Sequence, residues 1–300
     1  MRLRRCELST PGSNSKMIEK ALASNADLVF LDLEDAVAPN QKVAARGIVI
    51  NALKTLDWGK KTRAIRMNNI ETEWAYQDVI EVVEQAGEYL DVIIIPKVKQ
   101  ARDIFWVDTL LTQIEMRLKR KKKIALECLI EEVEALISVE EIAKSSPRLE
   151  AIIFGPGDYS ASQGVRAGKT IGGSITTYPG DVFHYARSKI VVAARAAGID
   201  PLDGPYADFK NPDGYREEAL RSATMGFIGK WAIHPSQIEI ANEMFSPTQE
   251  EVDRARRLEA AYAKAEEEGL GAITFEGVMI DAASVRIIRN TIAKADAIGM

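Results

Sequence analysis

Short apolar segments alternate with longer amphipathic stretches along the first 245 residues. Such alternation is typical of β-strands that are buried in a parallel sheet and connected by helices. The apolar segments that we predict to be strands lie at residues 5–8, 28–33, 63–67, 91–96, 124–129, 151–154, 198–202 and 226–233.

Helical periodicity fills the intervals between these strands. The predicted helices lie near residues 14–25, 39–54, 74–86, 100–120, 132–145, 181–197, 212–224 and 235–245. Each is long enough to return the chain to the start of the next parallel strand. The glycine pattern of open dinucleotide-binding sheets is absent, because Pro156 separates Gly155 from Gly157. The sequence therefore predicts an α/β fold of the closed (β/α)8 TIM-barrel type.

The pattern changes after Phe245. Ser246-Pro247-Thr248 combines a turn with a helix N-cap signal, and a charged helix is predicted over residues 249–268. Residues 272–280 are predicted to be one short extended segment, after which Asp281 can cap a last helix.

Chain length supports the same division. The 300 residues exceed by a small margin the ~250 residues that are typical of one barrel. We therefore predict a TIM-barrel catalytic domain at residues 1–245 and a mainly helical C-terminal extension at residues 246–300.

Composition excludes several classes of protein. A net charge of −5 argues against a nucleic-acid surface, which requires a concentrated basic face. No apolar run approaches the ~20 residues that cross a bilayer, and the N-terminal segment lacks the apolar region of a secretory signal. The two cysteines, Cys6 and Cys128, are predicted to be small core residues of a reduced compartment. We predict a cytoplasmic protein with no membrane contact.

Polar residues follow most of the predicted strands directly. The carboxyl ends of the strands carry the chemistry in barrels of this type, so these residues are candidates for an active site. They are Glu34 and Asp35 at the end of the second strand, Arg66 at the end of the third, Pro96 and Lys97 at the end of the fourth, Glu131 after the fifth, Gly155, Gly157 and Asp158 after the sixth, and His234 after the eighth.

Glu131 and Asp158 come from adjacent predicted strands. Carboxylates that converge on one rim repel each other unless a cation joins them, and oxygen ligands favour a hard divalent ion. Two carboxylates leave positions for water and substrate, which suits Mg²⁺, whereas zinc fits poorly because His184 and His234 are the only histidines. From the pattern alone, each acidic residue can equally be a helix cap or a solvated loop residue.

Two further residues of the rim have alternative interpretations. Arg66 can be an ion-pair partner of the acidic residues, or it can stabilise negative charge on a reacting oxygen. His234 precedes Pro235 at a predicted helix start, so its position is equally compatible with a structural role in the loop.

Several motifs resemble a known family along nearly the whole chain. They are Pro11-Gly12-Ser13 with Lys16, Asp32-Leu33-Glu34-Asp35-Ala36-Val37, Ile95-Pro96-Lys97-Val98, Ser146-Pro147-Arg148, Phe154-Gly155 with Asp158, and Ile233-His234-Pro235-Ser236-Gln237-Ile238. Together they resemble the citrate lyase β-subunit-like branch of the HpcH/HpaI aldolase superfamily.

Further motifs resemble the malyl-CoA and β-methylmalyl-CoA lyases within that branch. They are Arg5-Cys6, Asp57-Trp58-Gly59, Ser160-Ala161-Ser162-Gln163-Gly164, Ile171-Gly172-Gly173 and Gly229-Lys230-Trp231-Ala232. The resemblance implies a reversible, Mg²⁺-dependent cleavage of a 3-hydroxyacyl-CoA to glyoxylate and acetyl-CoA or propionyl-CoA, with Mn²⁺ able to substitute for Mg²⁺.

The resemblance also implies roles for individual residues. Glu131 and Asp158 would bind Mg²⁺, and Arg66 would stabilise the enolate or alkoxide oxygen, with Glu34 and Asp35 in the same catalytic site. The remaining candidates are assigned to the substrate or to CoA; they are Arg5, Lys16, Pro96, Lys97, Gly155, Gly157 and His234.

Asp281 matches the acid/base that the family supplies from the C-terminal segment of a neighbouring subunit. A short segment that cannot bury its own core is expected to pack on an adjacent barrel. The resemblance therefore implies a homo-oligomer, a trimer or a hexamer, in which the extension completes the neighbour's active site.

Alternative functions remain open on the sequence alone. A citramalyl-CoA lyase or a malyl-CoA thioesterase would use the same metal site. A carrier-dependent or non-catalytic citrate lyase β-like subunit is an alternative from another class, because a barrel by itself does not define a reaction.

Overall fold

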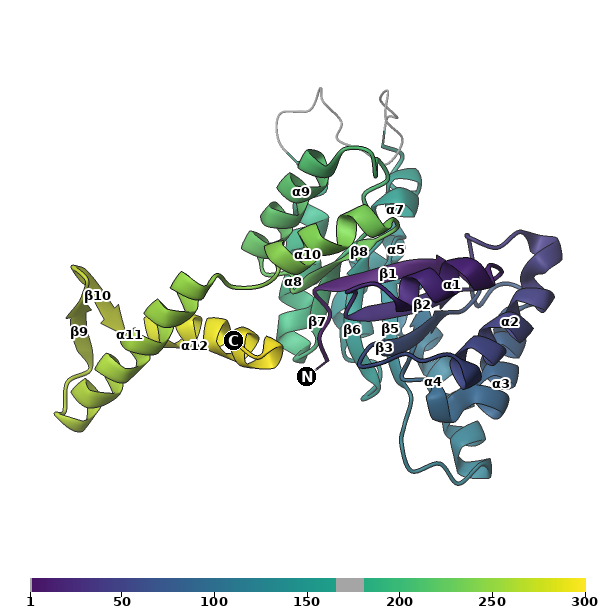
Figure 1. Cartoon of the computed structure of the whole chain (residues 1–300), viewed down its shortest axis with the longest axis horizontal. Helices are drawn as coiled ribbons and strands as arrows, with labels where there is room; N and C mark the ends of the chain where they lie inside the picture. Colours follow the sequence, from purple (N-terminus) through teal and green to yellow (C-terminus); the bar gives the residue numbers. More distant parts are fainter. Residues whose placement is uncertain (1, 166–180) are drawn as a thin grey trace. The chain divides into compact units, whose positions relative to one another are not determined.

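The computed structural model describes residues 2–165 and 181–300, so the motif Ile171-Gly172-Gly173 lies outside the described residues. The predicted barrel is confirmed, because eight parallel strands close in sequence order (Figure 1). They are β1 (Cys6–Pro11), β2 (Leu28–Asp32), β3 (Thr62–Arg66), β4 (Val92–Ile95), β5 (Ala125–Ile130), β6 (Leu149–Phe154), β7 (Asp200–Asp203) and β8 (Gly229–Ala232).

Helices alternate with these strands. They are α1 (Ser15–Leu22), α2 (Lys42–Thr55), α3 (Ala75–Ala86), α4 (Ala101–Arg117), α5 (Val133–Ile137), α6 (Val139–Ala143), α7 (Pro156–Ser162), α8 (His184–Ala197), α9 (Pro212–Met225) and α10 (Ile238–Met244). Short 3₁₀ turns occur at η1 (Pro39–Gln41), η2 (Gly87–Tyr89) and η3 (Pro235–Gln237).

The structure corrects two details of the predicted helices. The single helix predicted at 132–145 is interrupted at Ser138, which leaves helical geometry with φ −98° and ψ 11° between α5 and α6. Helix α7 was not predicted. It has seven residues, which is shorter than the window of about 11 residues in which a helical period can be recognised, and it starts with Pro156 at the first position, where a missing N–H costs no hydrogen bond.

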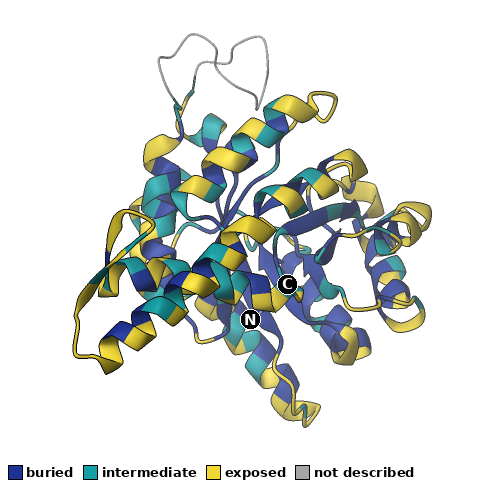
Figure 2. Cartoon of the chain, turned by 60° about the vertical axis from the view of Figure 1, so that its left-hand side comes forward, coloured by how far each residue is buried: buried dark blue, intermediate teal, exposed yellow. Residues whose placement is uncertain are grey.

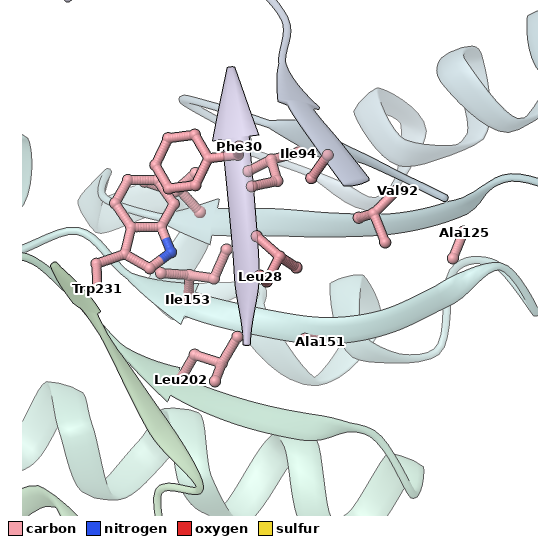
Figure 3. Packing of buried hydrophobic residues seen from close by; sticks show 11 residues of the cluster. Leu28, Phe30, Val92, Ile94, Ala125, Ala151, Ile153, Leu202 and Trp231 are labelled. Atoms are coloured by element: carbon pink, nitrogen blue, oxygen red, sulfur yellow. The ribbon is translucent and has the colours of Figure 1, made fainter. Parts of the chain in front are cut away.

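Both faces of the strands are buried, as expected when helices cover a parallel sheet (Figure 2). The barrel interior is filled by alternate strand residues (Figure 3), namely Leu28, Phe30, Ala64, Val92, Ile94, Ala125, Leu129, Ala151, Ile153, Leu202 and Trp231. The rings of Phe30 and Trp231 are in contact, with centroids 4.4 Å apart. The barrel is therefore a packed core rather than a pore.

Strand register determines which residues meet at the carboxyl end of the barrel. Asp32 of β2 pairs with Arg66 of β3, and Ile130 of β5 pairs with Phe154 of β6. The residues that directly follow the second pair, Glu131 and Gly155, are consequently neighbours on the rim.

The chain divides into two compact units, of which one is Arg4–Asn242 and the other contains Glu243–Met300. The second unit consists of α11 (Gln249–Glu267), β9 (Ala272–Phe275), β10 (Val278–Asp281) and α12 (Ala282–Ile298), which confirms a helical C-terminal extension. No helix in residues 2–165 and 181–300 has both the length and the apolar character that crossing a membrane would require.

The extended segment predicted in this unit is an antiparallel hairpin rather than a single strand. Glu276 and Gly277 turn the chain with φ values of 49° and 81°, the left-handed conformation that suits a two-residue hairpin turn. The unit has its own small core of Leu258, Tyr262, Ile280 and Val285.

Candidate active site

Arg66 is held by Asp32 at the ends of β3 and β2. Arg66 Nε donates to Asp32 Oδ1 at 2.8 Å, and Nη2 donates to Oδ2 at 2.6 Å. This bidentate pair fixes the plane of the guanidinium group. Burial would lower the pKa of Arg66, but the negative charges of Asp32 and Glu34 outweigh it and raise the pKa. Arg66 is therefore a fixed and permanent positive charge.

Asp32 also shapes the acidic loop after β2. Its Oδ1 accepts the N–H of Glu34 at 2.9 Å, and its Oδ2 accepts the N–H of Ala36 at 3.1 Å. The loop in turn places Glu34 Oε2 3.0 Å from Arg66 Nη1. Sequence reasoning assigned no role to Asp32, although it is part of the quoted motif, because the signal for its role is the register of two strands.

Lys97 connects this loop to the neighbouring carboxylate. Its Nζ forms an ion pair with Glu34 and lies 3.1 Å from Asp35 Oδ2, while its backbone N–H donates to Glu131 Oε1 at 2.7 Å. Burial would raise the pKa of Asp35, but Arg66 and Lys97 outweigh it and lower the pKa. The Lys97 backbone has φ 50°, an uncommon left-handed conformation that directs the N–H toward Glu131.

Glu131 occupies space that only a glycine at position 155 leaves open. A Cβ atom on Gly155 would lie 2.5 Å from both Cβ and Oε2 of Glu131. The Glu131 side chain is almost fully buried, with 2% of the residue exposed. Burial, reinforced by the charges of Asp158 and Glu34 and opposed by Arg66, raises the pKa of Glu131 to about 8.

Asp158 lies in the first turn of α7, and its charge acts on both Glu131 and Lys97. A divalent cation bound to Asp158 and Glu131 would remove the repulsion between them. Among the residues that the structure describes, no three carboxylate, imidazole or thiol side chains form a closed metal cage. Two carboxyl groups whose charges act on each other, as those of Glu131 and Asp158 do, are instead a donor set that fits an open Mg²⁺ site.

A buried amine supports the acidic loop and was missed by sequence reasoning. Lys42 Nζ donates to the carbonyl oxygens of Leu33 and Glu34 at 3.0 and 2.9 Å and to Asn68 Oδ1 at 2.6 Å. Asn68 is held by Asp78, whose Oδ2 accepts its Nδ2 at 2.6 Å. Burial lowers the pKa of Lys42. Nothing in the local sequence distinguishes Lys42 from a solvated lysine in the first turn of a helix.

The other predicted residues of the rim have varied surroundings. Pro96 is buried, and Gly157 is exposed with open space around its Cα. His234 is exposed, accepts the N–H of Ser236 at 3.2 Å and stacks on Phe209 with ring centroids 4.8 Å apart. His234 thus caps η3, the structural alternative that the sequence left open, and its contact with the substrate stays a prediction.

The two basic residues predicted to contact CoA lie at opposite ends of the strands. Lys16 is exposed in the first turn of α1, after the carboxyl end of β1. Arg5 precedes β1, and its guanidinium is bound to Asp27 at 2.7 and 2.9 Å. This placement at the amino end of the barrel does not favour contact between Arg5 and a substrate at the rim.

Asp281 belongs to the C-terminal unit, where it caps α12 as predicted. Its Oδ1 accepts the N–H of Ser284 at 3.0 Å and the hydroxyl of the same residue at 3.1 Å. These hydrogen bonds lower the pKa of Asp281, so the carboxylate is ionised near neutral pH. Its role as an acid/base stays a prediction.

A (β/α)8 barrel that carries a charged arginine among carboxyl groups at its rim is typical of enzymes that stabilise negative charge on oxygen. Residues 5–235 match the model of the HpcH/HpaI aldolase/citrate lyase family. The chain belongs to this family, as the resemblance of its motifs implied.

Known relatives match nearly the whole chain. The chain is 44% identical to the L-malyl-CoA/β-methylmalyl-CoA lyase of Rhodobacter capsulatus, over 98% of this chain and 95% of the relative. It is 36% identical to a (3S)-malyl-CoA thioesterase of Cereibacter sphaeroides, over the same shares. A solved structure of CitE from Mycobacterium tuberculosis, in complex with magnesium, acetoacetate and coenzyme A, is 28% identical with a TM-score of 0.77 and covers 99% of this chain and 100% of its own.

The contact between Gly155 and Glu131 predicts the effect of one methyl group. In the variant Gly155→Ala the new Cβ would displace the Glu131 carboxyl, and a displacement of about 1 Å is expected to lower kcat/KM about 100-fold. The matched control is Gly47→Ala in α2, where no atom lies within 4 Å of the added Cβ. Steady-state kinetics and thermal melting of both variants test this. Equal activity of the two would contradict the proposed packing.

The raised pKa of Glu131 predicts how cation binding depends on pH. Only an ionised carboxyl binds a metal, so if Glu131 is a ligand, a pKa of about 8 means that Mg²⁺ would compete with a proton below that pH. Affinity for Mg²⁺ should rise by about tenfold per pH unit up to about pH 8 and then level off. Isothermal titration calorimetry across this range tests it, with Glu131→Gln as the control. A flat profile would show that Glu131 is not the titrating ligand.

Proposed function

We propose that the chain is a Mg²⁺-dependent lyase that cleaves L-malyl-CoA or β-methylmalyl-CoA to glyoxylate and acetyl-CoA or propionyl-CoA. The main structural support is the fixed positive charge of Arg66, which acts on the buried Glu131 carboxyl. The 44% identity to a lyase of this name over nearly the whole chain supports the choice of substrate.

Glu131 and Asp158 are the proposed ligands of Mg²⁺. When bound, the ion supplies Lewis-acid polarisation of the oxo group of a 2-oxo acid and neutralises its carboxylate. Lys97 contributes by fixing Glu131 through its backbone N–H, while its ammonium group balances Glu34 and Asp35. The negative charges of Glu34 and Asp35 are therefore compensated by Lys97, which makes it easier for the rim to hold an anionic substrate.

Arg66 is the proposed stabiliser of the thioester oxygen. In the cleavage direction the substrate hydroxyl loses its proton to water, and the carbon that bears it becomes the oxo carbon of glyoxylate. The bond from this carbon to the acyl α-carbon breaks, and its electron pair moves toward the thioester carbonyl. Negative charge then develops on the enolate oxygen, where a pre-oriented guanidinium in a water-poor site stabilises it strongly. Asp32 keeps this group in place throughout, because it holds both Nε and Nη2.

Asp281 of a neighbouring subunit is the proposed acid/base. In the condensation direction an ionised carboxylate removes a proton from the acyl α-carbon, and the lowered pKa of Asp281 keeps its carboxylate ionised. In cleavage the same group returns that proton to the enolate carbon. The exposed Lys16, near the start of α1, is a proposed contact for CoA phosphates.

A second candidate is hydrolysis of malyl-CoA to malate and CoA. It is supported by the 36% identity to a malyl-CoA thioesterase over nearly the whole chain. Both reactions begin with the same chelated substrate, so the fate of the thioester distinguishes them. The cytoplasmic location predicted from the sequence remains a prediction.

Product analysis with malyl-CoA and Mg²⁺ tests the proposed reaction. Glyoxylate with acetyl-CoA identifies a lyase, whereas malate with free CoA identifies a thioesterase. The variant Asp158→Asn and an excess of EDTA should each lower turnover by at least about 1,000-fold, because a lost ligand removes the charge stabilisation that the cation provides. Full activity in either case would refute the metal site, and no turnover of any free CoA thioester would favour a carrier-dependent subunit.

A shared active site predicts complementation between two inactive variants. Asp158→Asn damages the barrel side and Asp281→Asn the extension side. In an exchanged mixture of a homotrimer or homohexamer, about a quarter of the sites combine an intact barrel with an intact extension. Activity should therefore recover to that fraction after subunit exchange. No recovery, together with sedimentation as a monomer, would place Asp281 outside the neighbour's site.

A further inference from the structure

Two carboxyl groups lie inside the barrel and have no part in the proposed reaction. Glu7 of β1 and Glu127 of β5 are both completely buried. Arg4 is the nearby cation, and its Nε donates to Glu127 Oε1 at 2.9 Å. Its other guanidinium nitrogens are bound by Glu150 at 2.5 Å and Asp200 at 3.0 Å. One positive charge is thus already shared by three acids.

Glu7 receives too little compensation to be an anion. Its Oε1 is buried and receives no N–H or O–H hydrogen bond from the described residues, and it lies 3.9 Å from Arg4 Nε, beyond hydrogen-bonding range. The Glu127 carboxyl is within hydrogen-bonding reach of Glu7. Two carboxyl groups in contact in a buried site need a proton between them. Burial, followed by the charge of Glu127, raises the pKa of Glu7 well above its ordinary value.

The Trp231 side chain connects the other oxygen of Glu7 to Arg66 at the active site. Glu7 Oε2 accepts the indole N–H of Trp231 at 2.9 Å, and the two residues are register partners of β1 and β8. The Trp231 ring packs on Phe30 (Figure 3) and lies 5.6 Å from Arg66 Cζ, within cation–π range. Arg66 is therefore held by Asp32 on one side and by the Trp231 ring on another.

We propose that Glu7, held in its protonated form by Glu127, is a positioning residue that fixes the Trp231 ring and thereby orients Arg66 for the reaction. A neutral Glu7 meets both requirements at once, because its O–H can donate to Glu127 while its other oxygen accepts from Trp231. An ionised Glu7 would be repelled by the negative charge of Glu127. It would also attract the positive charge of Arg66 toward the core and away from the rim. This role rests on the proposed function of Arg66 and extends it into the barrel interior.

The charged surroundings of Glu7 come from several elements. Arg4 precedes β1, Glu127 lies in β5, and Glu150 of β6 and Asp200 of β7 bind Arg4. From β8, Trp231 provides an N–H donor and no titratable group. The proton is therefore shared between the two glutamates.

The experiment compares Glu7→Gln with Glu7→Met in the full-length protein. Glutamine provides an acceptor for Trp231 and an N–H donor for Glu127, so kcat should stay within about twofold of the parent. Methionine fills similar space but leaves the indole N–H without an acceptor. We expect Glu7→Met to lower kcat about tenfold with little change in KM, because Arg66 acts mainly in the transition state. Trp231→Phe should behave like Glu7→Met, and the double variant should be no worse than either.

A spectroscopic readout separates this role from a loss of stability and from a failure of the proposed function. In protein labelled with [¹⁵N]tryptophan, the Trp231 indole resonance is assigned through Trp231→Phe. It should be unchanged in Glu7→Gln and shifted in Glu7→Met, whether or not malyl-CoA is the substrate. If Glu7→Met does not fold, the proposal is tested by comparing the kcat of Glu7→Gln, which should stay near that of the parent, with the kcat of Trp231→Phe, which should be lower.

Stability against pH gives a further test of the shared proton. Folded Glu7 keeps a proton above pH ~4.3, where a glutamate of the unfolded chain releases it, so this group's contribution to stability decreases as the pH rises toward its folded pKa. Glu7→Gln should melt at least as high as the parent near neutral pH, with a weaker dependence on pH. The proposal is overturned if Glu7→Gln is as inactive as Glu7→Met, because that result would mean that the ionised form of Glu7 is required. It is equally overturned if Glu7→Met keeps full kcat and an unchanged indole resonance.

Discussion

The ion pair between Asp32 and Arg66 is the interaction on which the rest of the site depends. It forms because β2 and β3 pair in register at their last residues, and it satisfies both oxygens of the carboxylate. The same oxygens accept backbone N–H groups of the following loop and so place Glu34 beside Arg66. One buried contact therefore orients the cation and shapes the acidic loop together.

Without a ligand, the acidic groups at the rim outnumber the cations that contact them. Carboxyl groups converge there from several strands, while Arg66 and Lys97 supply the positive charge that contacts them. Burial, together with the nearby charges of Asp158 and Glu34, raises the pKa of Glu131 to about 8. A site of this kind gains electrostatic energy when a divalent cation binds, and the apolar barrel interior beside it limits screening by water.

Much of the fold could be predicted because the strands and most helices have strong local signals. All eight predicted strands overlap observed ones, since a continuous apolar run between amphipathic segments has few other solutions. The failures involved short features. Helix α7 is too short to show a period, the break at Ser138 leaves the hydrophobic pattern intact, and the hairpin turn at Glu276 and Gly277 is masked by extended residues on either side.

By itself, the sequence determined the barrel, the extension, the family, and the set of rim residues from which a site can be built, because each follows from hydrophobic period or from motifs at strand ends. Only the tertiary structure decided how those residues pair. Asp32 with Arg66, Gly155 with Glu131, and Glu7 with Trp231 are each separated by at least 24 positions along the chain. Their contacts arise from strand register and barrel closure, which bring together residues that no local pattern connects.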